Sequence, residues 1–249
     1  MKDIQLPKFS IVTVCKNSPN LDKTCESIVE QTYKNYEWIV IDGGSEQDVR
    51  SILEKYKQSM DYFVSENDDG IYDAMNKGIS KSTGDYIIFM NGGDYFIYPY
   101  ILENANFMLE KYPYVDVLYG EECVTNHSDF ELVTYTKNEQ YLDEVLFKST
   151  IRHQASFIRR SCFMDCGYYD ITLSIVSDWK FFVVLHKNNK KFLKWNTIVA
   201  CCTSGGISSN LDLIKSERKK VISELYTPEE IFGFYKNIIQ KCRMKIIKK

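Results

Sequence analysis

Short apolar runs alternate with amphipathic segments between residues 9 and 90, and this alternation limits the fold more than any other feature. The run 9–15 is short, β-branched and largely apolar, which is typical of a strand buried on both faces. Apolar residues between 21 and 29 then recur at helical spacing. The alternation continues with strands predicted over 38–41, 62–64 and 86–90 and helices over 49–56 and 71–80. Repeated strand–helix units predict an α/β protein with a single Rossmann-like, mostly parallel sheet covered by helices.

After residue 100 the alternation is less strict. Helices are predicted over 101–112 and 178–185, and strands over 115–119, 130–135, 155–158 and 192–201. No linker rich in Gly, Pro or Ser separates the two halves, so we expect a mixed extension of the same sheet. We divide the chain into a sheet domain over 1–210 and a C-terminal helical, basic extension over 211–249. The extension is predicted to hold two amphipathic helices, the second capped by Thr227 with Pro228 at its first position.

Composition excludes several classes of protein. Apolar residues make up 44% of the 249 residues, so the chain is neither disordered nor of low complexity. The longest apolar runs reach only about five residues, whereas a membrane-spanning helix needs about 20. The first residues lack the apolar region of a secretory signal. The eight cysteines form no CxxC motif, so we expect reduced thiols and a cytoplasmic location.

Charge is distributed unevenly along the chain. Residues 211–249 carry ten Lys and Arg against five Asp and Glu, whereas the rest carries 21 against 29. The acidic body argues against a nucleic-acid partner. The basic tail is either a helix packed on the domain or an interfacial helix that lies on the inner leaflet of the plasma membrane. One face of the predicted tail helix carries Ile231, Phe234, Tyr235, Ile238 and Ile239.

Polar and acidic residues follow the predicted parallel strands. They are 16–17, Asp42, 66–69 and 91–94. Carboxyl ends of parallel strands meet at one edge of a sheet, which is where such sheets bind ligands. A dinucleotide-binding fingerprint, a P-loop and a GxSxG elbow are all absent from the sequence. An acidic edge would repel a bare diphosphate unless a divalent cation came with it, and Asp94 is the best-placed carboxylate to hold one. The alternative is that Asp42 and Asp94 only cap turns.

Taken in order, five segments resemble glycosyltransferase family 2, in particular its members that make bacterial surface polysaccharides. The segments are Ser10–Val14, Ile41–Ser45, Ser65–Gly78, Thr83–Asp85 and Phe89–Asp94. The resemblance extends over residues 8–210. It implies a GT-A fold, a nucleotide-sugar donor and transfer with inversion at the anomeric carbon.

The resemblance also implies roles for single residues. In the family's metal motif, usually Asp-x-Asp or Asn-Ser-Asp-Asp, this chain has Asn91-Gly92-Gly93-Asp94, so Asp94 would hold Mn²⁺ or Mg²⁺ as the one carboxylate. Asp42 matches the acid that contacts the base, and Asp68 the acid of the third donor loop. The residues expected to bind the donor are Val14, Lys16, Asp42, Gly43, Asp68, Asn76, Gly78, Asn91 and Gly92.

Three later segments complete the resemblance, and the first of them, His153–Phe157, matches the family's His-Gln segment before the acceptor region. Residues 175–179 match the segment with the catalytic acid, so Asp178 would be the general base that removes a proton from the acceptor hydroxyl. Apart from the family match, Asp178 could simply cap the helix after it, and His153 could be a structural histidine. Gly205–Ser208 match the loop that ends the catalytic core. The residues expected to bind the acceptor are His153, Gln154 and Trp179.

The leading hypothesis is a metal-dependent inverting hexosyl- or N-acetylhexosaminyltransferase. Its donor would be a UDP-sugar, and its acceptor a saccharide or polyprenyl-diphosphate-linked saccharide of capsule or O-antigen synthesis. The rival hypothesis is a nucleotide- or carbohydrate-binding protein of the same fold that has lost catalysis. A nucleotidyltransferase is disfavoured, since the loop after the first strand is not Gly-rich.

Overall fold

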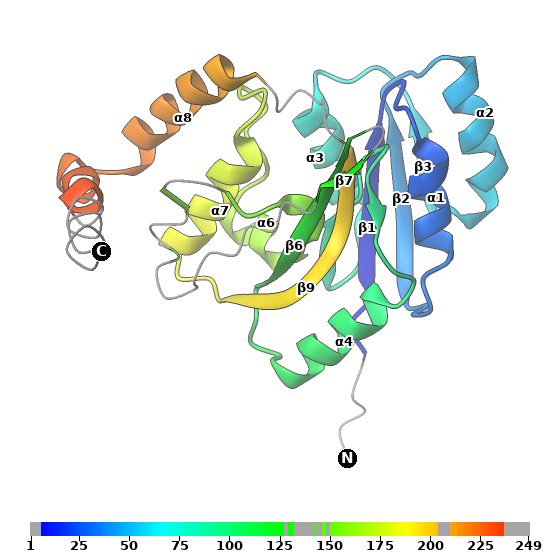
Figure 1. The fold of residues 1–249 in the computed structure, drawn as a ribbon, viewed down its shortest axis with the longest axis horizontal. Coiled ribbons are helices and arrows are strands. Elements are labelled where there is room, and N and C mark those ends of the chain that lie inside the picture. The colour runs from blue at the N-terminus through cyan, green and yellow to red at the C-terminus, as the bar shows by residue number, and fades with distance from the viewer. Residues whose placement is uncertain are drawn as a thin grey trace.

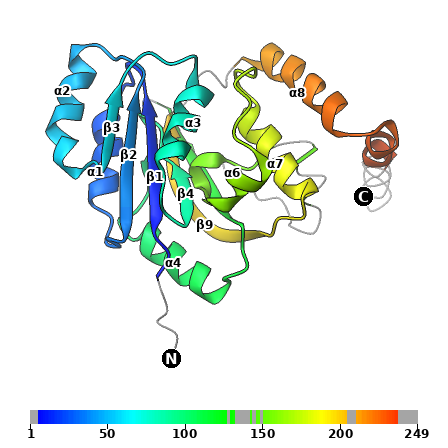
Figure 2. The ribbon, with the colours of Figure 1, turned by 180° about the vertical axis from the view of Figure 1, so that it is seen from behind.

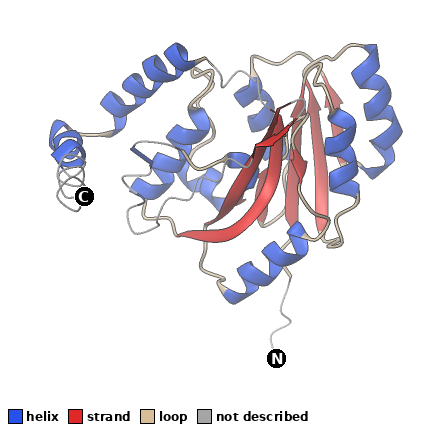
Figure 3. Ribbon diagram, in the orientation of Figure 1, coloured by secondary structure: helices blue, strands red, loops and turns tan. Residues whose placement is uncertain are grey.

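The computed structural model describes residues 6–126, 129–131, 142, 146–147, 150–203 and 210–236. These residues form a nine-stranded sheet with helices on both faces (Figure 1, Figure 3). The strand order is β3-β2-β1-β4-β8-β6-β9-β5, and β7 pairs with β6 at the side. The strands are β1 Phe9–Cys15, β2 Tyr36–Asp42, β3 Tyr62–Ser65, β4 Tyr86–Phe89, β5 Tyr95–Phe96, β6 Val117–Asn126, β7 Asp129–Glu131, β8 Ser156–Arg159 and β9 Phe192–Thr203.

The sheet is parallel on one side and mixed on the other. Strands β3, β2, β1 and β4 are all parallel neighbours. Strand β8 is antiparallel to both β4 and β6, whereas β6 and β9 are parallel to each other and β5 runs against β9. The predicted mostly parallel mixed sheet and the single continuous sheet are therefore confirmed.

Helices cover the two faces in two groups. Helices α1, α2 and α4 pack on one apolar core, and α3, α6, α7 and α8 belong to the other (Figure 2). The helices are α1 Leu21–Val29, α2 Gln47–Tyr56, α3 Ile71–Lys81, α4 Ile101–Lys111, α6 Ser161–Cys166, α7 Ser177–Lys187, α8 Leu211–Leu225 and a last one over 228–236, with short 3₁₀ turns η1 Lys57–Ser59 and η3 His153–Ala155.

Strand β1 shows why the sheet is buried on both sides. Every one of its residues is buried, and successive side chains point to opposite faces. Ile11 therefore joins the core under α1 and α2, whereas Val12 joins the core under α3. Gly78 of α3 lies so close to Val12 that a Cβ there would collide with Val12 Cγ1. This close approach seats α3 on β1, and α3 starts near the carboxyl edge of the sheet because it follows the end of β3.

Most predicted elements are present within one or two residues of their predicted bounds. The sequence missed β5, which has two residues, and α6, which has six. Of the strand predicted over 130–135, residues 130–131 belong to β7 and the rest lie outside the described residues. Gly205–Ser208 and residues 237–249 of the tail lie outside them as well.

The start of the last helix matches its prediction. The hydroxyl of Thr227 accepts a hydrogen bond from Glu230 N at 3.2 Å, and Thr227 N donates to Glu230 Oε2 at 2.7 Å. This reciprocal pair is a capping box. Within the described ranges, the helices are too short or too polar to cross a bilayer. The division of the chain at residue 210 stays a prediction.

Candidate active site

Asp42 joins three loops at the carboxyl edge of the sheet, which is the upper edge in Figure 1. Its carboxylate is fully buried and accepts hydrogen bonds from the backbone N and the hydroxyl of Ser45. Ser65 Oγ donates to it at 2.6 Å, and Cys15 Sγ lies 3.7 Å away. In this structure Asp42 therefore stabilises the ends of β1, β2 and β3 from inside. Its predicted contact with a nucleotide base would have to be made in addition to these bonds.

Next to Asp42, the edge is open to solvent. Lys16 is exposed and Asp68 is half-buried, and the two side chains meet over the backbone of Gly43. A Cβ at Gly43 would collide with the Asp68 carboxylate and lie 3.2 Å from Lys16 Cδ, so only glycine allows this approach. All three residues are predicted to bind the donor. Lys16 and Asp68 form an accessible surface with both signs of charge over Gly43, which is buried.

The predicted metal loop is a tight turn held by its neighbours. Asp94 N donates to Asn91 O at 2.9 Å, and Gly92 N donates to Val14 O at 2.9 Å. Gly93 has φ 101°, which favours glycine. A Cβ on Gly92 would lie 2.6 Å from Ser18 Oγ, so the turn packs directly on the loop after β1.

Asp94 is a buried carboxylate at the end of this turn. Its side chain receives a hydrogen bond from Gln154 Nε2 at 3.2 Å. Burial raises the pKa of Asp94 to about 6, although the attraction of His153 and the bond from Gln154 act in the opposite direction. At neutral pH the carboxyl is therefore mostly ionised, although its burial destabilises the ionised form.

The metal loop offers oxygen ligands but few carboxylates. Asn91 Oδ1 is buried and has no hydrogen-bond partner among the described residues. Together with Asp94 it gives two oxygens of the kind that Mg²⁺ and Mn²⁺ prefer. In the described part of the chain, no three His, Cys, Asp or Glu side chains gather as a metal site. The residues therefore fit a cation that arrives with a diphosphate, since such ions take one or two carboxylates and complete their shell with phosphate and water.

Asp178 lies at the second residue of α7, where it is 9% exposed. Its Oδ2 is 2.9 Å from His153 Nδ1, and its Oδ1 accepts a hydrogen bond from the Tyr72 hydroxyl at 3.0 Å. Burial opposes the charge, but the hydrogen bond and attraction of His153 outweigh it, with help from Tyr72, and keep the pKa of Asp178 below its usual range. The helix begins at Ser177 after Val176, so Asp178 is not its N-cap residue.

His153 and Gln154 connect the two carboxylates. They are consecutive residues of η3, and His153 faces Asp178 while Gln154 donates to Asp94. With its proton on Nδ1, the imidazole donates to Asp178, and its Nε2 accepts from the Asn91 carboxamide 3.2 Å away. The structure thus brings a buried carboxylate, a histidine and the predicted metal loop into one continuous set of contacts.

Four predicted site residues lie away from this set or are already engaged. Val14 is buried in β1, and Gly78 packs against that strand. Asn76 exchanges two hydrogen bonds with the backbone of Tyr169, at 2.9 and 3.0 Å. Trp179 is 2% exposed and donates its Nε1–H to Leu146 O at 2.6 Å, so an acceptor would reach its ring only if this contact opened.

The sequence also left functional side chains unassigned. Tyr72 belongs to the motif 65–78, but nothing in that motif says that its hydroxyl reaches a residue 106 positions away. Ser45 and Ser65 were part of quoted motifs too, and they bond to Asp42. A signal for the serines existed, because Ser45 lies three residues after the end of β2 and Ser65 is the last residue of β3, close to where a buried acid needs donors.

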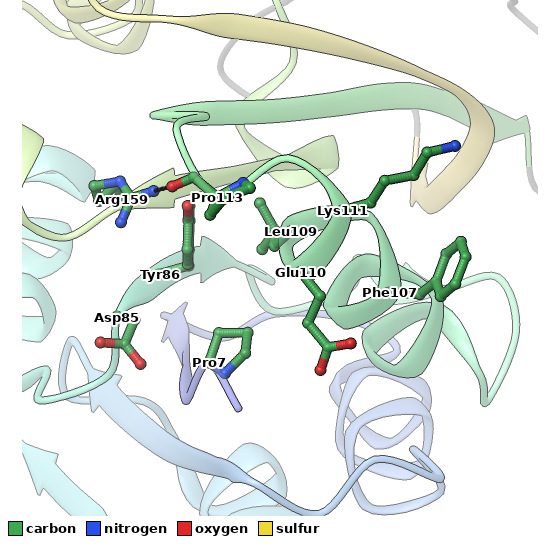
Figure 4. Close-up of a pocket in the computed structure, with 9 residues that line it drawn as sticks. All are labelled: Pro7, Asp85, Tyr86, Phe107, Leu109, Glu110, Lys111, Pro113 and Arg159. Atoms are coloured by element: carbon green, nitrogen blue, oxygen red, sulfur yellow. Dashed lines mark hydrogen bonds between the residues drawn. The ribbon is translucent and has the colours of Figure 1, made fainter. Parts of the chain in front are cut away.

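A pocket of about 650 Å³ lies at the other end of the sheet (Figure 4). It is lined by α4 and by the amino-terminal ends of β1 and β4, including Pro7 and Asp85. Its polar groups bond within the protein: Asp85 accepts from Lys8 N at 2.8 Å, and Arg159 donates to Pro113 O at 2.6 Å. The pocket is thus separate from the carboxyl edge and lacks its set of linked carboxylates.

Comparisons with known proteins agree with this geometry. The family model described as Glycosyl transferase family 2 matches residues 10–207. A PGL/p-HBAD biosynthesis glycosyltransferase of Mycobacterium tuberculosis is 26% identical over 211 residues, covering 82% of this chain and 80% of that protein. An uncharacterized glycosyltransferase of the same species is 33% identical over 185 residues, covering 70% and 67%.

Solved structures show the same fold at low identity. S. aureus TarS 1-349 in complex with UDP-GlcNAc superimposes with a TM-score of 0.70 at 17% identity, covering 88% of this chain and 71% of that one. The mannosyltransferase PcManGT from Pyrobaculum calidifontis, in complex with GDP-Man and Mn²⁺, gives 0.62 at 13%, covering 95% and 65%. At these identities the likeness is one of fold.

Proposed function

This chain belongs to glycosyl transferase family 2, and on that premise we propose that it transfers a sugar, with inversion, from a nucleoside diphosphate to a hydroxyl acceptor. It is a glycosyltransferase of the GT-A fold, as its sequence predicted. The observation that carries the proposal is the buried Asp178 carboxylate, which is bonded to His153 and Tyr72 and linked through Gln154 to Asp94.

Asp178 acts as the general base in this proposal. As the acceptor oxygen attacks the anomeric carbon, its proton passes to the Asp178 carboxylate, and the bond from the anomeric carbon to the diphosphate breaks with its electron pair on the leaving group. The donors His153 and Tyr72 orient the carboxylate. A carboxylate has about four lone-pair sites, so both oxygens can accept these bonds and still receive a proton.

The donor would extend from Lys16, Gly43 and Asp68 toward the turn 91–94. A divalent cation, Mn²⁺ or Mg²⁺, held by Asp94 and the Asn91 oxygen would offset the charge that develops on the leaving diphosphate. We propose UDP as the nucleotide, because TarS, which shares the fold, is known in complexes with UDP and UDP-GlcNAc. The sugar would be a hexose or an N-acetylhexosamine.

For the acceptor we propose a saccharide, free or on a polyprenyl diphosphate, in surface-polysaccharide synthesis. A lipid-linked acceptor would place the enzyme at the inner leaflet. In the last described helix, the predicted apolar face packs on the domain, since Phe234 stacks on Phe147 with ring centroids 4.6 Å apart. Phe232, which is 70% exposed, is the apolar side chain of this helix that is open to a membrane surface.

The first test is a thermal-shift panel of nucleoside diphosphates, each with and without Mn²⁺. Binding to the folded state at about 100 times Kd stabilises it by about 2.7 kcal/mol, so a Mn²⁺-dependent shift with one nucleotide is expected. The second test is transfer from UDP-sugars by Asp178→Asn, which is expected to lose at least about 100-fold in kcat. The control is Asp212→Asn, whose side chain is 98% exposed. Full transfer by Asp178→Asn would remove Asp178 as the base.

The second candidate is a nucleotide- or carbohydrate-binding protein without catalysis. It is favoured by one observation, that the metal loop holds a single carboxylate, Asp94. Nucleotide binding that ignores Mn²⁺, with no turnover on a broad acceptor panel, would support this candidate over the transferase.

A further inference from the structure

Helix α7 presents Asp178 from its first turn, and the start of a helix needs partners for its free N–H groups. The N-cap position of α7 is Val176, which has no side chain that could accept a hydrogen bond. The backbone N–H groups directly before this turn, at residues 174–176, do find a hydrogen-bond partner. It lies on α8, 41 residues beyond Val176.

Glu217 of α8 supplies this partner. Its carboxylate accepts hydrogen bonds from the backbone N of Ser174 at 2.7 Å, Ile175 at 3.0 Å and Val176 at 3.2 Å. Glu217 is 9% exposed, so these bonds are shielded from water. A negative charge before the first turn of α7 also interacts favourably with the helix dipole.

The bonds of Glu217 reach Asp178 through one further residue. The Tyr72 hydroxyl has a single proton, which two acceptors share. One of them is the carbonyl oxygen of Ile175, 2.5 Å away, and the N–H of Ile175 bonds to Glu217. The same hydroxyl lies 3.0 Å from Asp178 Oδ1. Glu217 therefore fixes the backbone on which one of the two orienting contacts of Asp178 depends.

Contacts between α7 and the C-terminal helices continue along the whole of α7, and Figure 1 shows α8 beside it. Arg218 stacks over Trp179, with its Cζ 4.1 Å from the ring centroid, and donates to Phe147 O at 2.9 Å. Lys180 pairs with Glu224 at 2.7 Å, and Lys187 pairs with Glu230 at 2.8 Å. Because these contacts run from the first turn to the last, α7 is fixed to α8 and to the helix over 228–236.

We infer that Glu217 is a positioning residue of the transferase, and that α8 belongs to its catalytic unit. Glu217 holds the turn 174–176 so that Asp178 meets the acceptor hydroxyl in the reactive geometry. The inference rests on the proposed role of Asp178. It predicts a loss in kcat with little change in donor binding, since Lys16, Gly43 and Asp68 lie on other loops.

The test compares Glu217→Ala, Glu217→Gln and the control Asp212→Asn, all in the full chain. Asp212 is a carboxylate in the first turn of the same helix, 98% exposed and paired only loosely with Lys215 at 3.6 Å. The kinetic probe is UDP release from UDP-GlcNAc, and donor binding is followed by the thermal shift with UDP. A misplacement of about 1 Å can cost about 100-fold in rate.

For Glu217→Ala we expect kcat to fall about 100-fold while KM for UDP-GlcNAc stays within twofold. Glu217→Gln keeps one acceptor oxygen and should lose about 10-fold, and Asp212→Asn should match the wild type. A kcat of Glu217→Ala within twofold of the wild type would overturn the inference. So would equal losses in kcat and UDP binding, because they would indicate general unfolding.

Hydrogen–deuterium exchange separates this inference from the proposed function. Amides 174–178 are expected to exchange at least about 10-fold faster in both Glu217 variants, with α4 unchanged as an internal reference. Unchanged exchange at 174–178 would refute the role of Glu217 even if the enzyme is active. If the Glu217 variants exchange faster at 174–178 but the wild-type chain turns over no donor, the positioning contact is supported and the proposed transferase activity is contradicted.

Discussion

Asp94 gives the site a pH dependence that an ordinary aspartate would not have. Its pKa is raised to about 6 by burial, so about 90% of the carboxyl is ionised at pH 7 and about 10% at pH 5. A metal ion binds only the ionised form. The apparent affinity for Mn²⁺ is therefore expected to fall about tenfold between pH 7 and pH 5, which is about 1.4 kcal/mol. If Asp94 had an unperturbed pKa of about 3.9, the apparent affinity for Mn²⁺ would fall by less than about 10% between pH 7 and pH 5.

Free Mn²⁺ can be followed by electron paramagnetic resonance while the ion alone is titrated into the protein at both pH values. Leaving nucleotide out avoids the titration of its own phosphates. In Asp94→Asn the pH dependence of Mn²⁺ binding should disappear. Any pH dependence that this variant keeps would come from other groups, such as the histidines. Equal Mn²⁺ affinity at pH 5 and pH 7 in the wild type would refute the reasoning about burial.

Two stability predictions follow from other parts of the fold. Although burial opposes its charge, hydrogen bonds led by that from Lys8 lower the pKa of Glu37 to about 2, so its stabilisation is complete above pH ~4.3 and is lost as the pH falls toward 2. Since Lys8 is 38% exposed and partly screened, Glu37→Gln should cost about 1–3 kcal/mol in urea unfolding at pH 7 and less at pH 3; an equal cost at both would contradict this. Gly78→Ala would press a Cβ into Val12 and should cost about 1–3 kcal/mol, measured by the same unfolding experiment; an unchanged midpoint would contradict it.

The parallel half of the fold was predictable because its strands are buried on both faces. The sequence of a strand such as β1, with every residue buried, is a largely apolar run that only Ser10 and Thr13 interrupt, and it differs clearly from the helices around it. The polar residues after these runs then had to meet at one edge. Strand β5 was not predictable in the same way, since two residues, Tyr95 and Phe96, carry no periodicity.

For the site, recognisable motifs predict the residues but not the contacts between them. Asp178 and His153 were both identified, yet nothing in the sequence says that they bond to each other. Glu217 carries no motif and lies 42 residues beyond Ile175, so only the packing of α8 on α7 reveals its role. Asp42 shows a different limit of motif matching. Its motif predicts contact with a ligand, but in the structure its carboxylate is buried and accepts hydrogen bonds from serines.

The turn η3 connects the two carboxylates. His153 and Gln154 are neighbours in the chain, so their Cα atoms are separated by one trans peptide of about 3.8 Å. Both contacts therefore depend on the same short piece of backbone, and a displacement of η3 would disturb the hydrogen bond to Asp178 and the hydrogen bond to Asp94 together. If the proposed roles hold, one turn of the chain connects the uptake of the proton to the departure of the diphosphate.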